Sequence, residues 1–419
     1  MSILVEKTSD VLVIGGGAAG LMAALAAAET GAKVTLLEKN EKLGKKIYIT
    51  GKGRCNVTNL CDTGEFLRNV PRNPRFLYAA LNAFGPGDML SLLEKWGCGT
   101  KVERGRRAFP VSDKASDVTK ALERGMKAGN VRVLLNAPVK ALSVSDGRVS
   151  GAVTEDGRFF PARAVVLCTG GLSYPSTGST GDGHRMARDA GHEVTACVPS
   201  LTGLNTLEKW PAELQGLSLR NVTLTARNGK KTLYSELGEL LFTHFGISGP
   251  LALECSAHLP ESGQGALEID LKPGLTMEQM EARLSREIAA AGKRRLTTML
   301  ETLLPARMAG LFPGIIGLDG QKTCCQLSAQ ERRHLAEGLK ALPLTVMELR
   351  PFAEAVITRG GVAVREISPS TMASRKVKGL YFAGELMDVD AHTGGYNLQI
   401  AFSTGALAGR SAGLEALNV

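Results

Sequence analysis

The sequence predicts an α/β protein whose chain leaves its first domain and returns to it at the C-terminus. Three observations predict this organisation. A β–α–β pattern with a glycine-rich turn opens the chain at residues 10–38, strand-like and then helical patterns occupy residues 198–349, and a strand followed by a long apolar helix closes the chain. A length of 419 residues with 44% hydrophobic residues is ordinary for a globular protein of two or three domains.

The first β–α–β unit carries the residues that bind a dinucleotide in folds of this kind. Residues 10–14 predict a buried strand, an apolar helix follows, and residues 33–37 predict a second strand that ends at Glu38. The turn after the first strand is a G-x-G-x-x-G pattern made by Gly15, Gly17 and Gly20. The helix N-terminus favours the pyrophosphate, and Glu38 is expected to accept both ribose hydroxyls and to disfavour a 2′-phosphate.

Composition and charge exclude several other classes of protein. The formal net charge of +9 suits an anionic partner such as RNA, a nucleotide or an anionic membrane surface, although a basic charge is also common in cytosolic enzymes. The eight cysteines form no C-x-x-C pair, which argues against a metal site or a disulfide framework and favours a cytoplasmic protein. Residues 11–28 lack charge but run in the order strand, turn and helix, so we expect no membrane span.

The C-terminal segment favours FAD over NAD as the dinucleotide. Residues 380–385 predict a strand ending in Ala-Gly-Glu, and a helix is expected from Leu398 after a glycine turn. In FAD enzymes of this architecture the returning chain holds the flavin half, so Glu385 is expected to take a ribityl hydroxyl. The helix N-terminus near Asn397 is then expected to face the flavin C2 carbonyl. On spacing alone, one more α/β crossover explains the same pattern.

A polar loop, G-K-G-R-C-N-V-T-N at residues 51–59, follows the nucleotide unit. In this architecture the chain crosses here over the pyrophosphate toward the isoalloxazine ring, which explains its glycines and its lack of core residues. Cys55 is a candidate proton donor, because flavin-dependent reduction of a double bond adds a hydride to one carbon and a proton to its neighbour. A small buried thiol packed beside the cofactor is the competing interpretation of Cys55. Tyr396 and His392 are rival donors.

The inserted region is expected to hold a β-barrel and then helices. Alternating residues and an Asn-Gly hairpin signal at Asn228 predict strands, whereas capping boxes at Thr276 and Ser328 predict helices. His244 lies in a turn-rich stretch and is a candidate proton or hydrogen-bond donor; a buried histidine that fixes a loop is the alternative. The expected domains are a first part of the FAD-binding domain at 1–197, a barrel at 198–273, a helical subdomain at 274–349 and a return segment at 350–419.

Several motifs together resemble the BaiN/RdsA (YhiN-like) family of NAD(P)/FAD-dependent oxidoreductases. They are the glycine pattern with Glu38, LGKKIYITGKGRCNVTN at 43–59, GRRAFPVS at 105–112, CTGGLSYP at 168–175, LLFTHFGISGP at 240–250 and AGELMDVDAHTGGYNLQ at 383–399. The resemblance covers essentially the whole chain. It implies a Rossmann-type FAD-binding domain with an inserted β-barrel plus helical subdomain. It also implies reduction of a carbon–carbon double bond, either in a uridine of 23S ribosomal RNA or in a small enone such as an unsaturated oxo bile acid.

The hypothesis is therefore an FAD-dependent oxidoreductase that favours rRNA, with a small-enone reductase and a flavin-containing RNA-binding or ribosome-assembly factor as alternatives. No second glycine motif occurs, so NAD(P)H is expected to bind only transiently as the reductant. An arginine cluster at Arg104, Arg106 and Arg107, preceded by other arginines, is a candidate for tracking an RNA backbone, or else a solvated face. The expected catalytic residues are Cys55, His244 and Tyr396. The expected cofactor-binding residues are Gly15, Gly17, Ala18, Ala19, Gly20, Glu38, Lys39, Lys45, Gly51, Gly53, Arg54, Cys55, Asn56, Thr169, Gly170, Gly171, Gly384, Glu385, Gly395, Asn397 and Leu398.

Overall fold

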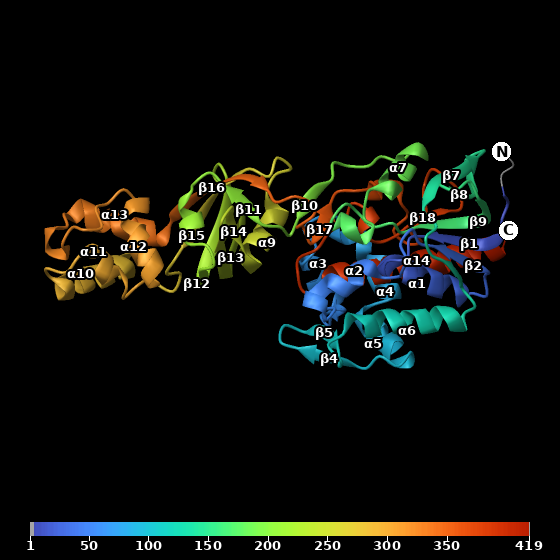
Figure 1. The fold of residues 1–419 in the computed structure, drawn as a ribbon, viewed down its shortest axis with the longest axis horizontal. Helices are drawn as coiled ribbons and strands as arrows, with labels where there is room; N and C mark the ends of the chain where they lie inside the picture. Colours follow the sequence, from blue (N-terminus) through green and yellow to red (C-terminus); the bar gives the residue numbers. More distant parts are fainter. Residues whose placement is uncertain (1–3, 419) are drawn as a thin grey trace. The chain divides into compact units, whose positions relative to one another are not determined.

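A computed structural model describes residues 4–418 and divides the chain into two compact units. The terminal unit consists of residues 1–199 and 355–419, and the inserted unit of residues 200–354. Figure 1 draws the chain as a ribbon and labels helices and strands of both units where there is room.

A seven-stranded sheet forms the centre of the terminal unit, in the order β6-β2-β1-β9-β8-β7 with β18 also paired to β9. The pairs among β6, β2, β1, β9 and β18 are parallel, whereas β7, β8 and β9 pair in antiparallel fashion. The parallel strands are short apolar runs buried by helices, as expected for a doubly covered sheet. The strands are β1 (Ser9–Ile14), β2 (Val34–Leu37), β6 (Arg132–Leu134), β7 (Val139–Ser145), β8 (Arg148–Thr154), β9 (Phe159–Leu167) and β18 (Leu380–Phe382).

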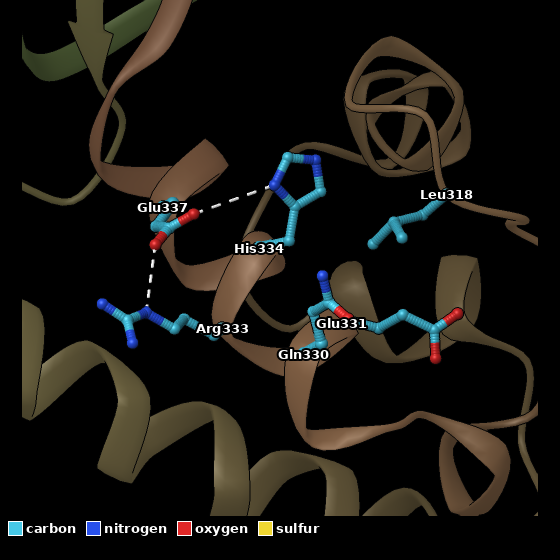
Figure 2. A pocket seen from close by; sticks show the side chains of 6 residues that line it. All are labelled: Leu318, Gln330, Glu331, Arg333, His334 and Glu337. Carbon is cyan, nitrogen blue, oxygen red and sulfur yellow. Dashed lines mark hydrogen bonds and ion pairs between the residues drawn. The ribbon is translucent and has the colours of Figure 1, made fainter.

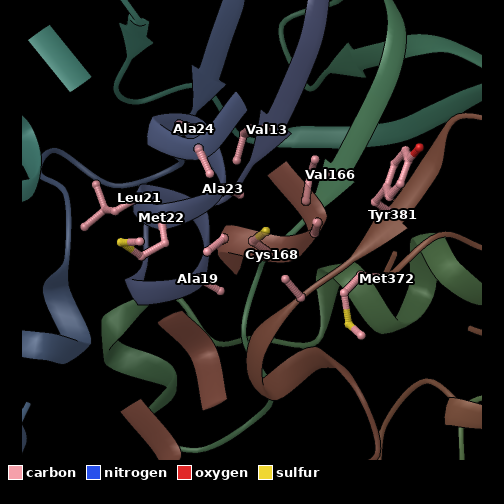
Figure 3. Close-up of a cluster of buried hydrophobic side chains, with 14 of the residues drawn as sticks. Val13, Ala19, Leu21, Met22, Ala23, Ala24, Val166, Cys168, Met372 and Tyr381 are labelled. Carbon is pink, nitrogen blue, oxygen red and sulfur yellow. The ribbon is translucent and has the colours of Figure 1, made fainter. Parts of the chain in front are cut away.

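Two helices from opposite ends of the chain, α1 (Ala18–Ala28) and α14 (Tyr396–Leu417), pack closely together. Glycines at every fourth position of α14 face α1: a Cβ would lie 2.3 Å from the Ala19 carbonyl oxygen at Gly405 and 2.1 Å from the Ala23 oxygen at Gly409. Backbones approach this closely only where side chains are absent. Figure 3 shows the small side chains of α1 meeting side chains of β1, β9 and the C-terminal segment in one core.

The segment between β2 and β6 forms a satellite of short elements beside a three-stranded antiparallel sheet of order β3-β5-β4. Three short helical turns, one helix and two short strands lie in the terminal unit after β9, in addition to β18 and α14. The elements of the satellite are α2 (Lys45–Ile49), η1 (Thr50–Gly53), β3 (Thr58–Asn59), α3 (Thr63–Arg68), η2 (Pro74–Leu77), α4 (Tyr78–Ala83), α5 (Pro86–Lys95), β4 (Thr100–Glu103), β5 (Arg107–Pro110) and α6 (Ala115–Ala128). The later elements are η3 (Pro175–Thr177), α7 (Asp182–Asp189), β10 (Val198–Ser200), β17 (Ile357–Arg359), η5 (Val364–Glu366) and η6 (Gly384–Leu386).

The inserted unit contains a closed barrel of order β11-β14-β13-β12-β15-β16, in which β16 pairs with both β15 and β11. The predicted hairpin turn at Asn228 is confirmed, because β12 ends there and β13 begins at Lys231. A helix within this region, α9, was not predicted from the alternating pattern. The elements are β11 (Leu204–Thr206), α8 (Trp210–Glu213), β12 (Ser218–Asn228), β13 (Lys231–Thr243), β14 (Gly246–Ser248), α9 (Gly249–His258), β15 (Gly265–Asp270) and β16 (Leu342–Leu349).

The helical part of the inserted unit lies between β15 and β16. Both predicted capping boxes are present, with the Thr276 and Ser328 hydroxyls accepting from the third residue of their helices. The range 274–349 that the sequence assigns to helices also holds β16, because the chain completes the barrel only after the helices. The elements are α10 (Met277–Ala291), α11 (Leu296–Leu300), α12 (Ala306–Ile315), η4 (Cys324–Gln326) and α13 (Ala329–Lys340). The predicted α/β fold class with an inserted barrel and helices is confirmed, and none of the described helices is long and apolar enough to span a membrane.

The contact between α14 and α1 predicts a large effect of a single methyl group. Gly409→Ala is expected to destabilise the protein by about 1–3 kcal/mol, because its Cβ would overlap the Ala23 carbonyl oxygen 2.1 Å away. Gly87→Ala, in α5 of the same unit, is the control, since no described atom lies within 4 Å of its Cβ. Urea unfolding of both variants measures the difference, and equal midpoints would contradict the packing argument.

Candidate active site

The carboxyl ends of four parallel strands meet at one edge of the terminal unit's sheet. β1 leads into the glycine turn, β2 into Glu38, β9 into residues 168–171 and β18 into residues 383–385. Ligands of open α/β sheets bind at this edge. The structure therefore brings the expected nucleotide-binding segments together.

The glycine turn combines two close backbone approaches with one open position. Gly15 has φ +101°, and a Cβ there would lie 2.6 Å from the Cys168 carbonyl oxygen; at Gly20 a Cβ would lie 1.8 Å from the Gly15 oxygen. A Cβ at Gly17, in contrast, would meet no described atom within 4 Å. Gly17 thus faces open space at the N-terminus of α1, whose first residues Ala18 and Ala19 have free backbone N–H groups.

Glu38 is buried, and its carboxylate is hydrogen-bonded to the glycine turn. Its Oε2 accepts from the Gly16 N–H at 2.6 Å, and its Oε1 accepts from the Asn40 backbone and side-chain N–H groups at 2.8 and 2.6 Å. A carboxylate offers about four acceptor positions, so about one remains for a ribose hydroxyl. For Glu38 to accept both ribose hydroxyls, as the sequence predicts, one of these three N–H donors would have to give up its place.

Lys39 and Lys45, two of the predicted cofactor-binding residues, are both paired with carboxylates. The Lys39 ammonium lies 2.7 Å from Asp182, and the Lys45 ammonium lies 3.1 Å from Glu41. Lys46, which is not among the predicted cofactor-binding residues, points instead toward Ser173 and Glu385. Since α2 turns by about 100° per residue, only one of the two neighbouring lysines reaches the interior.

Glu385 is the centre of a buried polar network. Lys46 donates to its Oε2 at 2.6 Å, while the Thr358 N–H at 2.9 Å and the Ser173 hydroxyl donate to its Oε1. Burial alone would raise the pKa of Glu385, but the Lys46 charge and these hydrogen bonds outweigh it and lower that pKa. The carboxylate therefore stays ionised. Lys46 and Ser173 both lie in motifs quoted above, yet spacing gave no signal that they meet.

The loop at residues 51–59 divides into an outward and an inward half. Gly51, Lys52 and Gly53 are exposed and have positive φ, as part of the distorted turn η1. The Arg54 guanidinium pairs with Glu103 and Asp113 and covers the Phe109 ring at 4.2 Å. These contacts anchor the loop to β4 and to the chain after β5.

Cys55 turns inward and has no exposed surface. Burial raises the pKa of its thiol to about 12, partly offset by a hydrogen bond with Thr50. A thiol enclosed on all sides is a poor proton donor to a substrate, so the structure favours the packing role. Cys55 and Cys61 are both free thiols, and no disulfide joins them.

Tyr396 is also buried, with its ring edge-on to Phe66 at 5.0 Å and its hydroxyl bonded to the Cys61 thiol. His244 lies in the inserted unit, between β13 and β14, where it is exposed and stacks edge-on against Phe245. The alternative of a buried histidine is therefore wrong. The three expected catalytic residues do not form one cluster within the terminal unit.

The turn before α14 touches the loop at residues 51–59. Gly395 has φ +100°, and a Cβ there would lie 2.6 Å from the Thr58 carbonyl carbon and 3.0 Å from Asn56 Oδ1. The Asn397 side chain closes this turn by exchanging hydrogen bonds with Ala391. Leu398 follows in the first turn of α14 and is half-buried. Gly384 packs beside Ala19, and its N–H donates to Thr404 at 3.0 Å.

The residues present fit an FAD. Within residues 4–418, the buried Asn56 Oδ1 and Thr169 Oγ1 have no hydrogen-bond partner; Thr169 follows the end of β9, and Asn56 lies beside Gly395 before α14. Gly170 has φ +73°, and Gly171 packs against Thr358, so neither position accepts a side chain. A dinucleotide with a polar ring edge would satisfy these atoms and use the open face of Gly17.

A hollow of about 560 Å³ lies in the helical part of the inserted unit (Figure 2). It is lined by Leu318, Gln330, Glu331, Arg333, His334 and Glu337. Arg333 pairs with Glu337 at 3.2 Å within this lining, and Glu331 pairs with Lys322 at 2.7 Å. Across residues 4–418 no group of three His, Cys, Asp or Glu side chains is arranged to hold a metal ion.

Comparison with known proteins finds relatives that match nearly the whole chain. A family model for the HI0933-like protein Rossmann domain matches residues 9–411. A protein named 3-dehydro-bile acid delta(4,6)-reductase from Clostridium scindens is 33% identical over 96% of this chain and 98% of its own. A protein named ribosomal RNA dihydrouridine synthase from Escherichia coli is 33% identical over 94% of this chain and 96% of its own.

Solved structures support the fold. A quinol fumarate reductase subunit of Escherichia coli has a TM-score of 0.51 at 18% identity, covering 99% of this chain and 71% of that one. A 3-ketosteroid delta1-dehydrogenase of Sterolibacterium denitrificans also has a TM-score of 0.51, at 15% identity, covering 98% of this chain and 100% of that one.

The Lys46–Glu385 pair predicts a non-additive mutant cycle. Lys46→Met is expected to cost about 3 kcal/mol, because it leaves a buried carboxylate without its cation. Adding Glu385→Gln should recover part of this loss, since the neutral amide still accepts from Thr358 and Ser173. Urea unfolding of the two single variants and the double variant measures the coupling, and simple additivity would show that the pair does not stabilise the unit.

Cys55 is expected to resist alkylation. Its pKa of about 12, against about 8.5 in an unfolded chain, means that the native thiol stays protonated while the unfolded one ionises. Iodoacetamide at pH 8.5 should label the exposed Cys325 but not Cys55, and should label both in urea. By the same difference, this site contributes stability that is lost as the pH rises from about 9 to 12. Peptide mapping by mass spectrometry gives the labelling, and rapid native labelling of Cys55 would refute its enclosure.

Proposed function

The chain belongs to the HI0933-like Rossmann-domain family of FAD-binding oxidoreductases, and from this premise we propose that it reduces a uridine of 23S ribosomal RNA to dihydrouridine. The wider reaction, reduction of an activated carbon–carbon double bond, is the one named for its relatives with both RNA and bile acid substrates. The names of these relatives do not decide between the two substrates, so the choice rests on the chain itself.

The position of the net charge carries the proposal. Residues 42–127 contain 17 Lys and Arg against 8 Asp and Glu, whereas the remaining chain contains 33 of each sign. The whole formal charge of +9 therefore belongs to one segment, which includes the loop at residues 51–59. A strongly basic segment beside the reaction site suits a polyanion far better than a neutral enone ring.

The residues of the terminal unit supply binding and proton control. Bound FAD would supply the hydride, and NAD(P)H is the proposed transient source of its electrons. Gly17 and the N-terminus of α1 would hold the pyrophosphate, Glu38 a ribose hydroxyl, and the N-terminus of α14 the flavin ring edge. Among the candidate donors of the terminal unit, His392 is half-buried, whereas Cys55 and Tyr396 are enclosed, so burial favours His392 as the proton donor.

A small hydrophobic enone is the second candidate substrate. The Clostridium scindens relative, whose name specifies a bile acid, matches nearly the full length of this chain at 33% identity. The same flavin site would serve either substrate, because both present a double bond conjugated to a carbonyl group.

Mapping of dihydrouridine in 23S RNA tests the choice between these substrates. A strain that lacks the gene is expected to lose dihydrouridine at one site, and the wild-type gene should restore it. His392→Gln should restore binding of the RNA but not the modification, whereas Cys55→Ala should restore both. An unchanged map in the deletion strain would reject the RNA substrate and leave the enone, for which anaerobic reoxidation of the reduced flavin is the assay.

A further inference from the structure

The β4–β5 hairpin presents arginines at its tip and is latched to a helix. Arg104, Arg106 and Arg107 are all exposed, at the turn between Glu103 and Ala108. Arg106 pairs with Glu65 of α3, and its carbonyl oxygen accepts from the Leu60 N–H at 2.9 Å. The sequence grouped the three arginines together, but the structure gives Arg106 a latching role.

Arg104 and Arg107 remain without a carboxylate within ion-pair distance among residues 4–418, and so does the exposed Arg68. Arg107 donates only to the Arg104 carbonyl oxygen, at 3.1 Å. Arg68 lies one helical turn after Glu65 on α3, which places it on the helix face that meets the hairpin. Three uncompensated guanidinium groups thus gather around one latch.

Arg68, Arg104 and Arg107 lack carboxylate partners although carboxylates are present elsewhere in the same satellite. Within the same satellite, Arg54 and Lys101 share Glu103 and Asp113 in a compact network. Charge repulsion among unpaired arginines costs stability, and nearby carboxylates relieve it where the chain provides them. The group formed by Arg68, Arg104 and Arg107 is therefore left open for an external anion.

One side chain connects this group to the candidate active site. Asn59 donates to the Gly105 carbonyl oxygen at 3.0 Å and to the Gly394 carbonyl oxygen at 3.3 Å. Gly105 is the hairpin tip, and Gly394 lies in the turn that opens α14. A polyanion held by the hairpin would therefore lie directly beside the edge of the proposed flavin site.

We propose that Arg68, Arg104 and Arg107 form a docking surface that holds phosphates of an RNA strand and delivers one base to the site next to Gly394. The proposal rests on the proposed RNA substrate and adds where that RNA is held. All three cations are arginines, whose planar fork donates two parallel hydrogen bonds to a phosphate. The exposed Tyr78, in the same satellite, offers a ring on which an unpaired base can stack.

Binding of a transcribed 23S rRNA fragment at several salt concentrations tests the surface. Arg104→Ala/Arg107→Ala is expected to weaken binding at least tenfold at low salt and to flatten the slope of log K against log salt by about 1.4 to 1.8, for two lost phosphate contacts. Lys230→Ala/Lys231→Ala removes the same charge from the β12–β13 turn of the inserted unit and should leave affinity and slope nearly unchanged. The flavin spectrum and anaerobic reoxidation by a small enone should be the same in all three proteins.

The outcomes separate the surface from the function. If the wild-type protein does not bind the RNA, both the RNA substrate and the surface are wrong. If it binds and the arginine variant keeps the same affinity and slope, or loses no more than the lysine control, the surface alone is overturned. Vesicles that contain phosphatidylglycerol complete the test, and binding to them as tight as to RNA would assign the arginines to a membrane instead.

Discussion

The close approach of α14 to α1 is the contact on which the rest of the terminal unit depends. Both helices begin on the side of the sheet where the parallel strands end. The N-terminus of α1 follows the glycine turn, and the N-terminus of α14 follows Gly395. If α14 stood farther from α1 by one methyl layer, its first turn could not lie against Thr58 and Asn56. Glycine at 405 and 409 is therefore a requirement of site geometry as well as of packing.

Much of the terminal unit could be predicted because its signals are local. The glycine pattern, the acid at Glu38 and the return of the chain at residues 380–398 all follow from short motifs, and the structure brings them together at one sheet edge. The hairpin at Asn228 and the capping boxes at Thr276 and Ser328 were predictable for the same reason.

The remaining features depend on contacts between residues far apart in sequence. Lys46 meets Ser173 and Glu385 across 127 and 339 positions, and no spacing rule links them. The direction in which Cys55 points follows from its positive φ of 60°, which a motif does not reveal. Helix α9 was missed because apolar residues that follow a proline fit a strand or a helix equally well until the barrel's own packing decides.

The order of the barrel strands has a consequence for how the protein is made. The helical part leaves the barrel at the end of β15 and returns at the start of β16, where Ile269 and Leu342 are paired neighbours. In sequence, the helical part is thus an insertion in the barrel and the barrel is an insertion in the sheet domain, so the barrel and the sheet domain are each completed by a later stretch of chain. During translation, the helical part therefore emerges in full before β16 can complete the barrel and before β18 and α14 can complete the sheet domain. The glycine turn is made early in synthesis, but the candidate nucleotide site is completed only when α14 has emerged from the ribosome.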